Sequence, residues 1–214
     1  MSPSLHRAKF SDWENITDEN RNIWQKVAYK SYGTLTPANL ASLAGGFLSV
    51  YGLFIVFNGE IVSGLSLLTI GRIADLLDGM IAEYTKTKSP LGELVDAIVD
   101  KLVVAFAVII FAVSGLVPWP IIALIAAVNI FNGLFGLLGK LKKLAMHPSK
   151  FGKYSTFLAW ITLIFYPLGI WIKAFESALT GMILIGIALI SFAFFVVIGL
   201  VASINYGRIV VKKK

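Results

Sequence analysis

Six apolar stretches, each long enough to cross a lipid bilayer as a helix, constrain the fold of this chain more than any other feature. A helix needs roughly 20 predominantly apolar residues to cross the hydrocarbon core. The stretches lie near residues 38–57, 61–84, 93–115, 118–139, 154–174 and 178–206. Only 14% of the residues are charged, against about 25% in soluble domains. The sequence therefore predicts an all-α integral membrane protein with six transmembrane helices.

The distribution of Lys and Arg predicts the orientation of these helices. Basic residues gather in the N-terminal 34 residues, in the second and fourth connections and at the C-terminus, whereas the opposite side has only Lys173. Such an excess marks cytoplasmic segments. We therefore expect a multi-pass protein of the inner or plasma membrane type with both termini in the cytoplasm. The net charge of +7 is assigned to topology and anionic lipid, and nucleic-acid binding is not expected.

The chain divides into a juxtamembrane segment (1–34), a helical domain (35–207) and a basic tail (208–214). Ser11 to Glu14 is typical of a capping box, and apolar residues then recur at helical spacing. This pattern predicts an amphipathic helix on the cytoplasmic membrane surface, with a solvated linker as the alternative. The absence of cysteine excludes disulfides and zinc–thiolate sites.

Four aspartates interrupt the second and third apolar stretches. Asp75 and Asp78 are three residues apart, and Asp96 and Asp100 are four apart, so each pair shares one face of a helix. The connection between the two stretches is short, which makes the helices antiparallel neighbours. We therefore expect the two acidic faces to meet.

Burying these carboxylates in a membrane is costly enough to require a function. A charged residue at mid-helix costs about 2.5–3.5 kcal/mol, so four would cost on the order of 10 kcal/mol. Bound Mg²⁺ or a similar hard cation would hold converging carboxylates together. Two such cations can stabilise displacement at phosphorus. The residues alone thus favour phosphoryl or phosphatidyl transfer. The alternatives are carboxylates that serve only helix–helix contacts, and a metal or proton pathway without chemistry.

The spacing of these residues resembles the signature of the CDP-alcohol phosphotransferase family. The pattern runs Asp75-x₂-Asp78-Gly79-x₂-Ala82-x₉-Gly92-x₃-Asp96-x₃-Asp100. The resemblance implies six spans, a cytoplasm-facing site, a frequent homodimer, and transfer of a phosphatidyl group from CDP-diacylglycerol to an alcohol with release of CMP. It also implies two divalent cations, Mg²⁺ or Mn²⁺.

The same resemblance assigns roles to individual residues. Asp75, Asp78 and Asp96 are expected to ligate the metals, and Asp100 to share that role or to act as general base. The residues expected to bind the CDP moiety are Asp75, Gly79, Ala82, Gly92 and Asn39, the last from a segment (36–40) similar to the start of the family's first span. One position departs from the pattern: Glu83 stands where the family usually has arginine. A weakened or inactive relative is therefore an open alternative.

The acceptor alcohol is predicted from two further segments. Residues 95–101 and 148–156 are similar to the phosphatidylglycerophosphate and cardiolipin synthase branch. Lys101, Lys150 and Lys153 would suit an acceptor that carries a phosphate, since lysine is a compact phosphate-binding charge. We expect glycerol 3-phosphate, with inositol phosphate, another phospholipid or a neutral alcohol as alternatives. A divalent-cation carrier is the competing class, although few charges lie on the side opposite the acids.

Overall fold

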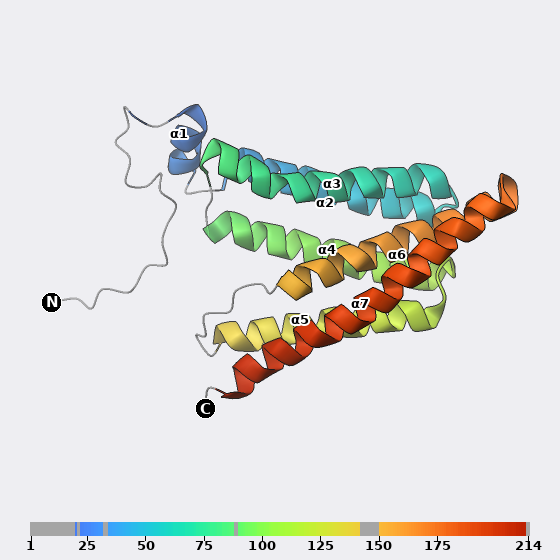
Figure 1. Cartoon of the computed structure of the whole chain (residues 1–214). Helices are drawn as coiled ribbons and strands as arrows, with labels where there is room; N and C mark the ends of the chain where they lie inside the picture. Colours follow the sequence, from blue (N-terminus) through green and yellow to red (C-terminus); the bar gives the residue numbers. More distant parts are fainter. Residues whose placement is uncertain (1–19, 21, 32–33, 88–89, 142–149, 213–214) are drawn as a thin grey trace. The chain divides into compact units, whose positions relative to one another are not determined.

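The computed structural model describes residues 20, 22–31, 34–87, 90–141 and 150–212. Over these residues the chain forms helices and no strand. The helices are α1 (Ile23–Lys30), α2 (Pro37–Phe57), α3 (Ile61–Thr85), α4 (Pro90–Ser114), α5 (Trp119–Leu141), α6 (Lys150–Phe175) and α7 (Ala178–Lys212) (Figure 1). The six long helices coincide with the six predicted apolar stretches to within a few residues.

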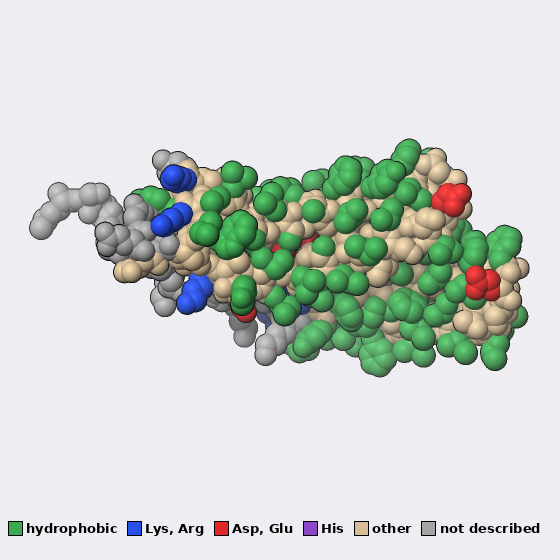
Figure 2. All heavy atoms as spheres, turned by 90° about the horizontal axis from the view of Figure 1, so that it is seen from above, with side chains coloured by type: hydrophobic (Ala, Val, Ile, Leu, Met, Phe, Trp, Pro, Cys, Tyr) green, Lys and Arg blue, Asp and Glu red, His purple; other side chains and the backbone are tan. Residues whose placement is uncertain are grey.

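Four helical segments are long and apolar enough to cross a membrane, judged over the described residues alone. They are Pro37–Phe57, Leu94–Ser114, Phe151–Phe175 and Ala178–Arg208, and a shorter apolar stretch covers Trp119–Phe135. Helix α3, with 25 residues, is long enough to cross a membrane, but its second half carries the charged residues Arg72, Asp75 and Asp78. Hydrophobic side chains dominate the face seen in Figure 2, and large ones such as Phe47 and Phe54 are more than half exposed. The chain is an integral membrane protein; six spans with cytoplasmic termini stay a prediction.

The contacts divide the chain into two compact units, residues 1–55 with 66–106, and residues 56–65 with 107–214. In the second unit, α6 and α7 approach closely where Gly169 meets Gly181. A Cβ on Gly169 would lie 2.9 Å from the carbonyl oxygen of Gly181. Helix α7 also meets α5, where the Ser203 hydroxyl donates to Asn132 Oδ1 over 2.9 Å. Small residues and interhelical hydrogen bonds thus hold this unit, as is common between membrane helices.

In the first unit, glycines bring three helix backbones together. A Cβ on Gly45 of α2 would lie 2.7 Å from the carbonyl oxygen of Gly71 on α3. A Cβ on the next residue, Gly46, would overlap the side chain of Val99 on α4. The adjacent glycines of α2 therefore let this helix contact α3 and α4 at one level. That level lies next to the aspartates.

Helix α1 completes the first unit by capping the end of α3. Asn22 and Gln25 form a capping box at the start of α1. Their side-chain amides also donate to the carbonyls of Thr85 (3.2 Å) and Lys86 (3.4 Å), which a helix C-terminus leaves without intrahelical partners. Lys86 has φ +54°, the left-handed conformation that often ends a helix.

Helix α1 is the described helix of the juxtamembrane segment, for which a surface helix is predicted. Gln25 and Ala28 are buried, whereas Ile23 and Trp24 are exposed, so α1 presents apolar side chains away from the unit. Its position on a membrane surface stays a prediction. The capping box predicted at Ser11 to Glu14 lies outside the described residues.

We predict that Gly45→Ala destabilises the protein by about 1–3 kcal/mol, the usual cost of overpacking a tight contact. The added methyl group would meet backbone atoms of α3, which cannot move as a flexible side chain can. Thermal unfolding of detergent-purified protein measures the effect. Gly186→Ala on α7 is the control, since a Cβ there meets nothing within 4 Å. Equal melting temperatures for the two variants would contradict the packing argument.

Candidate functional site

The first unit brings three of the predicted acidic residues into one cluster. Asp75 and Asp78 come from α3 and Asp96 comes from α4, and one carboxylate oxygen of each lies within 4.8 Å of the others. Asp78 is buried, and the other two are partly buried. The expected meeting of the two acidic helix faces is therefore present in the structure.

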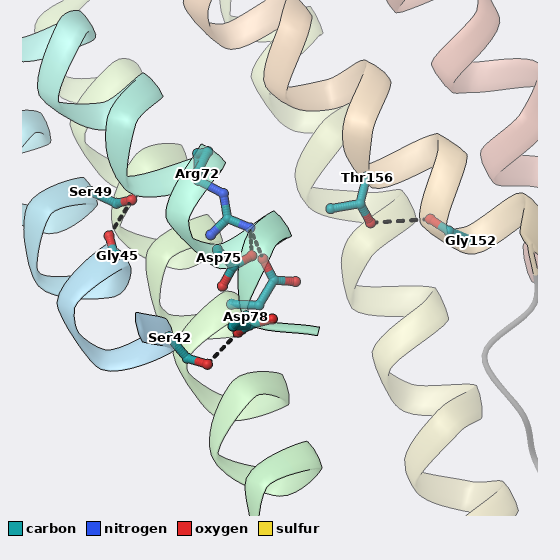
Figure 3. Close-up of polar contacts among 9 residues, drawn as sticks. Ser42, Gly45, Ser49, Arg72, Asp75, Asp78, Gly152 and Thr156 are labelled. Atoms are coloured by element: carbon teal, nitrogen blue, oxygen red, sulfur yellow. Dashed lines mark hydrogen bonds and ion pairs between the residues drawn. The ribbon is translucent and has the colours of Figure 1, made fainter. Parts of the chain in front are cut away.

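Asp100, the fourth predicted acid, is held differently. Arg72 Nη2 donates to Asp100 Oδ1 over 2.7 Å and to Asp75 Oδ2 over 2.5 Å (Figure 3). The Arg72 side chain is 12% exposed and that of Asp100 is 33% exposed. Arg72 lies one helical turn before Asp75, so it reaches its neighbour on α3 and crosses to α4 at the same time. A single guanidinium nitrogen thus joins the first and last acids of the pattern.

A buried serine from α2 supports the cluster from a third helix. The Ser42 hydroxyl donates to Asp78 Oδ2 (Figure 3). The close approach at Gly45 and Gly71, one turn and more along the same helices, is what lets so short a side chain reach α3. Hydrogen bonds to a carboxylate fix its orientation, which matters most where that carboxylate binds a ligand.

The cluster has the properties that a divalent cation requires. Asp75 Oδ1 is buried, and no described residue donates a hydrogen bond to it. A buried oxygen without a donor is uncommon in proteins unless an ion or water completes it. Hard cations such as Mg²⁺ are bound by carboxylate oxygens of this kind. The residues therefore fit a divalent metal, with Asp75, Asp78 and Asp96 as the candidate ligands.

The residues predicted to bind CDP have varied surroundings. Gly79 is exposed and has open space where a side chain would stand, while Ala82 and Gly92 are partly buried. Asn39 is buried, and its side-chain amide donates to the carbonyl of Thr34 over 2.9 Å, within the turn before α2. An open surface at Gly79 suits a bulky ligand. The binding role of these residues stays a prediction.

The predicted acceptor-phosphate residues are divided between the two units. Lys101 follows Asp100 on α4 in the first unit and is exposed. Lys150 and Lys153 belong to the first turn of α6 in the second unit, and Lys153 is exposed. Glu83, the residue in place of the usual arginine, is exposed on α3.

The sequence analysis did not predict the hydrogen bond from Ser42 to Asp78, and it did not predict which acids pair with Arg72. A signal for Ser42 was present: Asn39, Ser42 and Ser49 are polar residues in an otherwise apolar helix. Polar groups on a membrane helix usually face protein rather than lipid. That argument selects Ser42 as a buried residue but does not identify Asp78 as its partner.

Comparison with known proteins gives the family. The family model described as CDP-alcohol phosphatidyltransferase matches residues 35–201. A Drosophila melanogaster protein named "Probable cardiolipin synthase (CMP-forming)" is 29% identical over 143 residues, covering 66% of this chain. A CDP-diacylglycerol–glycerol-3-phosphate 3-phosphatidyltransferase of Cereibacter sphaeroides is 32% identical over 117 residues, covering 53% of this chain. The matches cover 40% and 52% of those two relatives. No solved structure matches the chain.

We predict that Ser42→Ala weakens Mn²⁺ binding by about 10-fold, the lower end of the effect of removing a group that orients a metal ligand. Titration of purified protein with Mn²⁺, followed by the electron paramagnetic resonance signal of the free ion, measures the affinity. Ser49→Ala is the matched control, because Ser49 is buried on the same helix and its hydroxyl donates to the Gly45 carbonyl instead. Equal affinities in the two variants would mean that Ser42 does not orient a metal ligand.

Proposed function

The chain belongs to the CDP-alcohol phosphatidyltransferase family, and from that membership we propose that it transfers a phosphatidyl group from CDP-diacylglycerol to an alcohol in phospholipid synthesis. The observation that carries the proposal is the cluster of Asp75, Asp78 and Asp96, which lies in the matched region on two neighbouring helices. Because the chain spans about half or less of the relatives named above, the activity is proposed for the region that it shares with them.

We assign the metal-binding role to the clustered carboxylates and propose two divalent cations, Mg²⁺ or Mn²⁺, in the working enzyme. Bound cations would offset the charge of the diphosphate and of the departing CMP oxygen. Asp75, Asp78 and Asp96 provide the ligands, and Ser42 orients one of them. The open surface at Gly79, with Ala82 and Gly92, provides room for the CDP moiety.

Asp100 is the proposed general base. It is more exposed than Asp75, the other acid bonded to Arg72, so an acceptor alcohol can approach it. The acceptor oxygen forms a bond to the lipid-linked phosphorus, and the bond from that phosphorus to CMP breaks. The hydroxyl proton passes to Asp100, and CMP leaves with the electron pair of the broken bond. Proton acceptance by a positioned carboxylate typically contributes 10²–10⁴-fold to such a step.

Glycerol 3-phosphate is the proposed acceptor. The name of the Cereibacter sphaeroides relative includes this acceptor, and exposed Lys101 beside Asp100 suits its phosphate. The Drosophila melanogaster relative, named for cardiolipin synthesis, favours a phospholipid acceptor as the second candidate. We further propose a multi-pass homodimer whose site faces the cytoplasm.

We predict that Asp96→Asn reduces metal-dependent CMP release at least 100-fold while the protein stays folded. The amide removes the only ligand of the three-residue cluster that comes from α4. CMP release from CDP-diacylglycerol with Mg²⁺ measures the effect, and size-exclusion chromatography checks the fold. Glu60→Gln, an exposed acid between α2 and α3, is the control. Wild-type turnover by Asp96→Asn would remove Asp96 from the metal site.

We predict that CMP release requires both metal and a phosphorylated acceptor. The assay compares glycerol 3-phosphate, inositol phosphate, serine and phosphatidylglycerol, each added separately. Release with glycerol 3-phosphate supports the proposed acceptor, and release with phosphatidylglycerol alone replaces it by the second candidate. If no acceptor supports release, while metal enters sealed vesicles that contain the protein, the carrier alternative is favoured.

A further inference from the structure

Arg72 bonds to a particular part of the acidic cluster. Its contacts are Asp75 Oδ2 and Asp100 Oδ1. The group of carboxylates close enough to share an ion contains Asp75, Asp78 and Asp96 but not Asp100. Asp100 is therefore paired with the guanidinium outside the group of three, while Asp75 belongs to that group and is bonded to Arg72 as well.

We propose that Arg72 sets the order in which the cluster takes its cations. The inference rests on the proposed function, in which the cluster is a metal centre. The first cation would bind Asp75, Asp78 and Asp96 and leave the contact between Arg72 and Asp100 in place. The second cation would use one oxygen of Asp100 as a ligand, and so would bind only when Asp100 leaves Arg72 as the diphosphate of CDP-diacylglycerol arrives.

Charge explains the order. Arg72 and one divalent cation together offset most of the charge of the four aspartates. A second divalent cation without substrate would have to displace a partly buried guanidinium from its carboxylate. The two cations would then repel each other in a region of low effective dielectric. Removing one partner of a buried ion pair leaves a costly charge behind.

The diphosphate removes this obstacle. Its negative charge compensates both the second cation and the displaced guanidinium. Arginine presents donors in a planar fork that matches phosphate oxygens. Once released from Asp100, Arg72 can donate to the diphosphate, and the Asp100 oxygen that does not hold the second cation can accept the proton of the acceptor. Arg72 thereby supplies a cation on α3, the helix on which this chain has Glu83 where the family pattern has arginine.

Mn²⁺ binding to purified protein tests the proposal without turnover. We expect wild-type protein to bind one equivalent of Mn²⁺ tightly and a second at least 10-fold more weakly, and CDP-diacylglycerol without acceptor to strengthen the second. Arg72→Gln should reduce the difference between the two affinities to less than threefold in the absence of the lipid. Lys101→Gln removes a cation one residue from Asp100 without touching the Arg72 contacts, and it should keep the wild-type difference. An unchanged difference in Arg72→Gln would overturn the proposal.

Asp100→Asn gives an independent test that does not depend on the folding of the Arg72 variant. It should retain the first equivalent of Mn²⁺ and lose the second. Loss of the first equivalent would overturn the proposal, because Asp100 would then belong to the first site. Either contradictory result leaves metal-dependent CMP release by the wild type intact, and so leaves the proposed function standing. A wild-type protein that binds no Mn²⁺ and releases no CMP would overturn both.

Discussion

The rest of the first unit depends on how four aspartates are accommodated on two apolar helices. Carboxylates within 4.8 Å of one another repel, and the low dielectric around membrane helices strengthens that repulsion. Two local contacts reduce this repulsion. Arg72 bonds an acid on each helix, and the Ser42 hydroxyl donates to Asp78. Asp75 Oδ1, buried with no donor among the described residues, marks where this compensation is incomplete. We propose that a divalent cation completes it.

The glycine contacts follow from the same requirement. The side chains of Ser42 and Asp78 are short compared with the usual distance of about 8–10 Å between packed helix axes, so they meet only where small residues allow a closer approach. Gly45, Gly46 and Gly71 provide that approach between α2, α3 and α4. The capping of α3 by α1 adds a second restraint on the helix that carries Asp75 and Asp78. Packing residues without any chemistry of their own thus position the acids.

The different surroundings of the acids support different roles for them. Asp78 is buried and orientated by a neutral donor, which suits a permanent ligand. Asp100 is more exposed and is bonded to a cation that substrate can compete for, which suits a group that changes partners during turnover. The position of Asp100 outside the group of three carboxylates gives the proposed site a direction, from the metal toward the incoming alcohol.

The sequence by itself determined the long helices, the faces that Asp75, Asp78, Asp96 and Asp100 occupy, and their meeting across a short connection. These features depend on apolar length, a period of 3.6 residues and loop length, which are all local in the chain. Only the tertiary structure decided that Ser42 bonds Asp78, 36 residues away, and that Arg72 pairs with Asp100, 28 residues away. Such contacts depend on the rotation and separation of packed helices. One methyl group added at a glycine can change both the rotation and the separation. The periodicity of a single helix contains no information on such contacts.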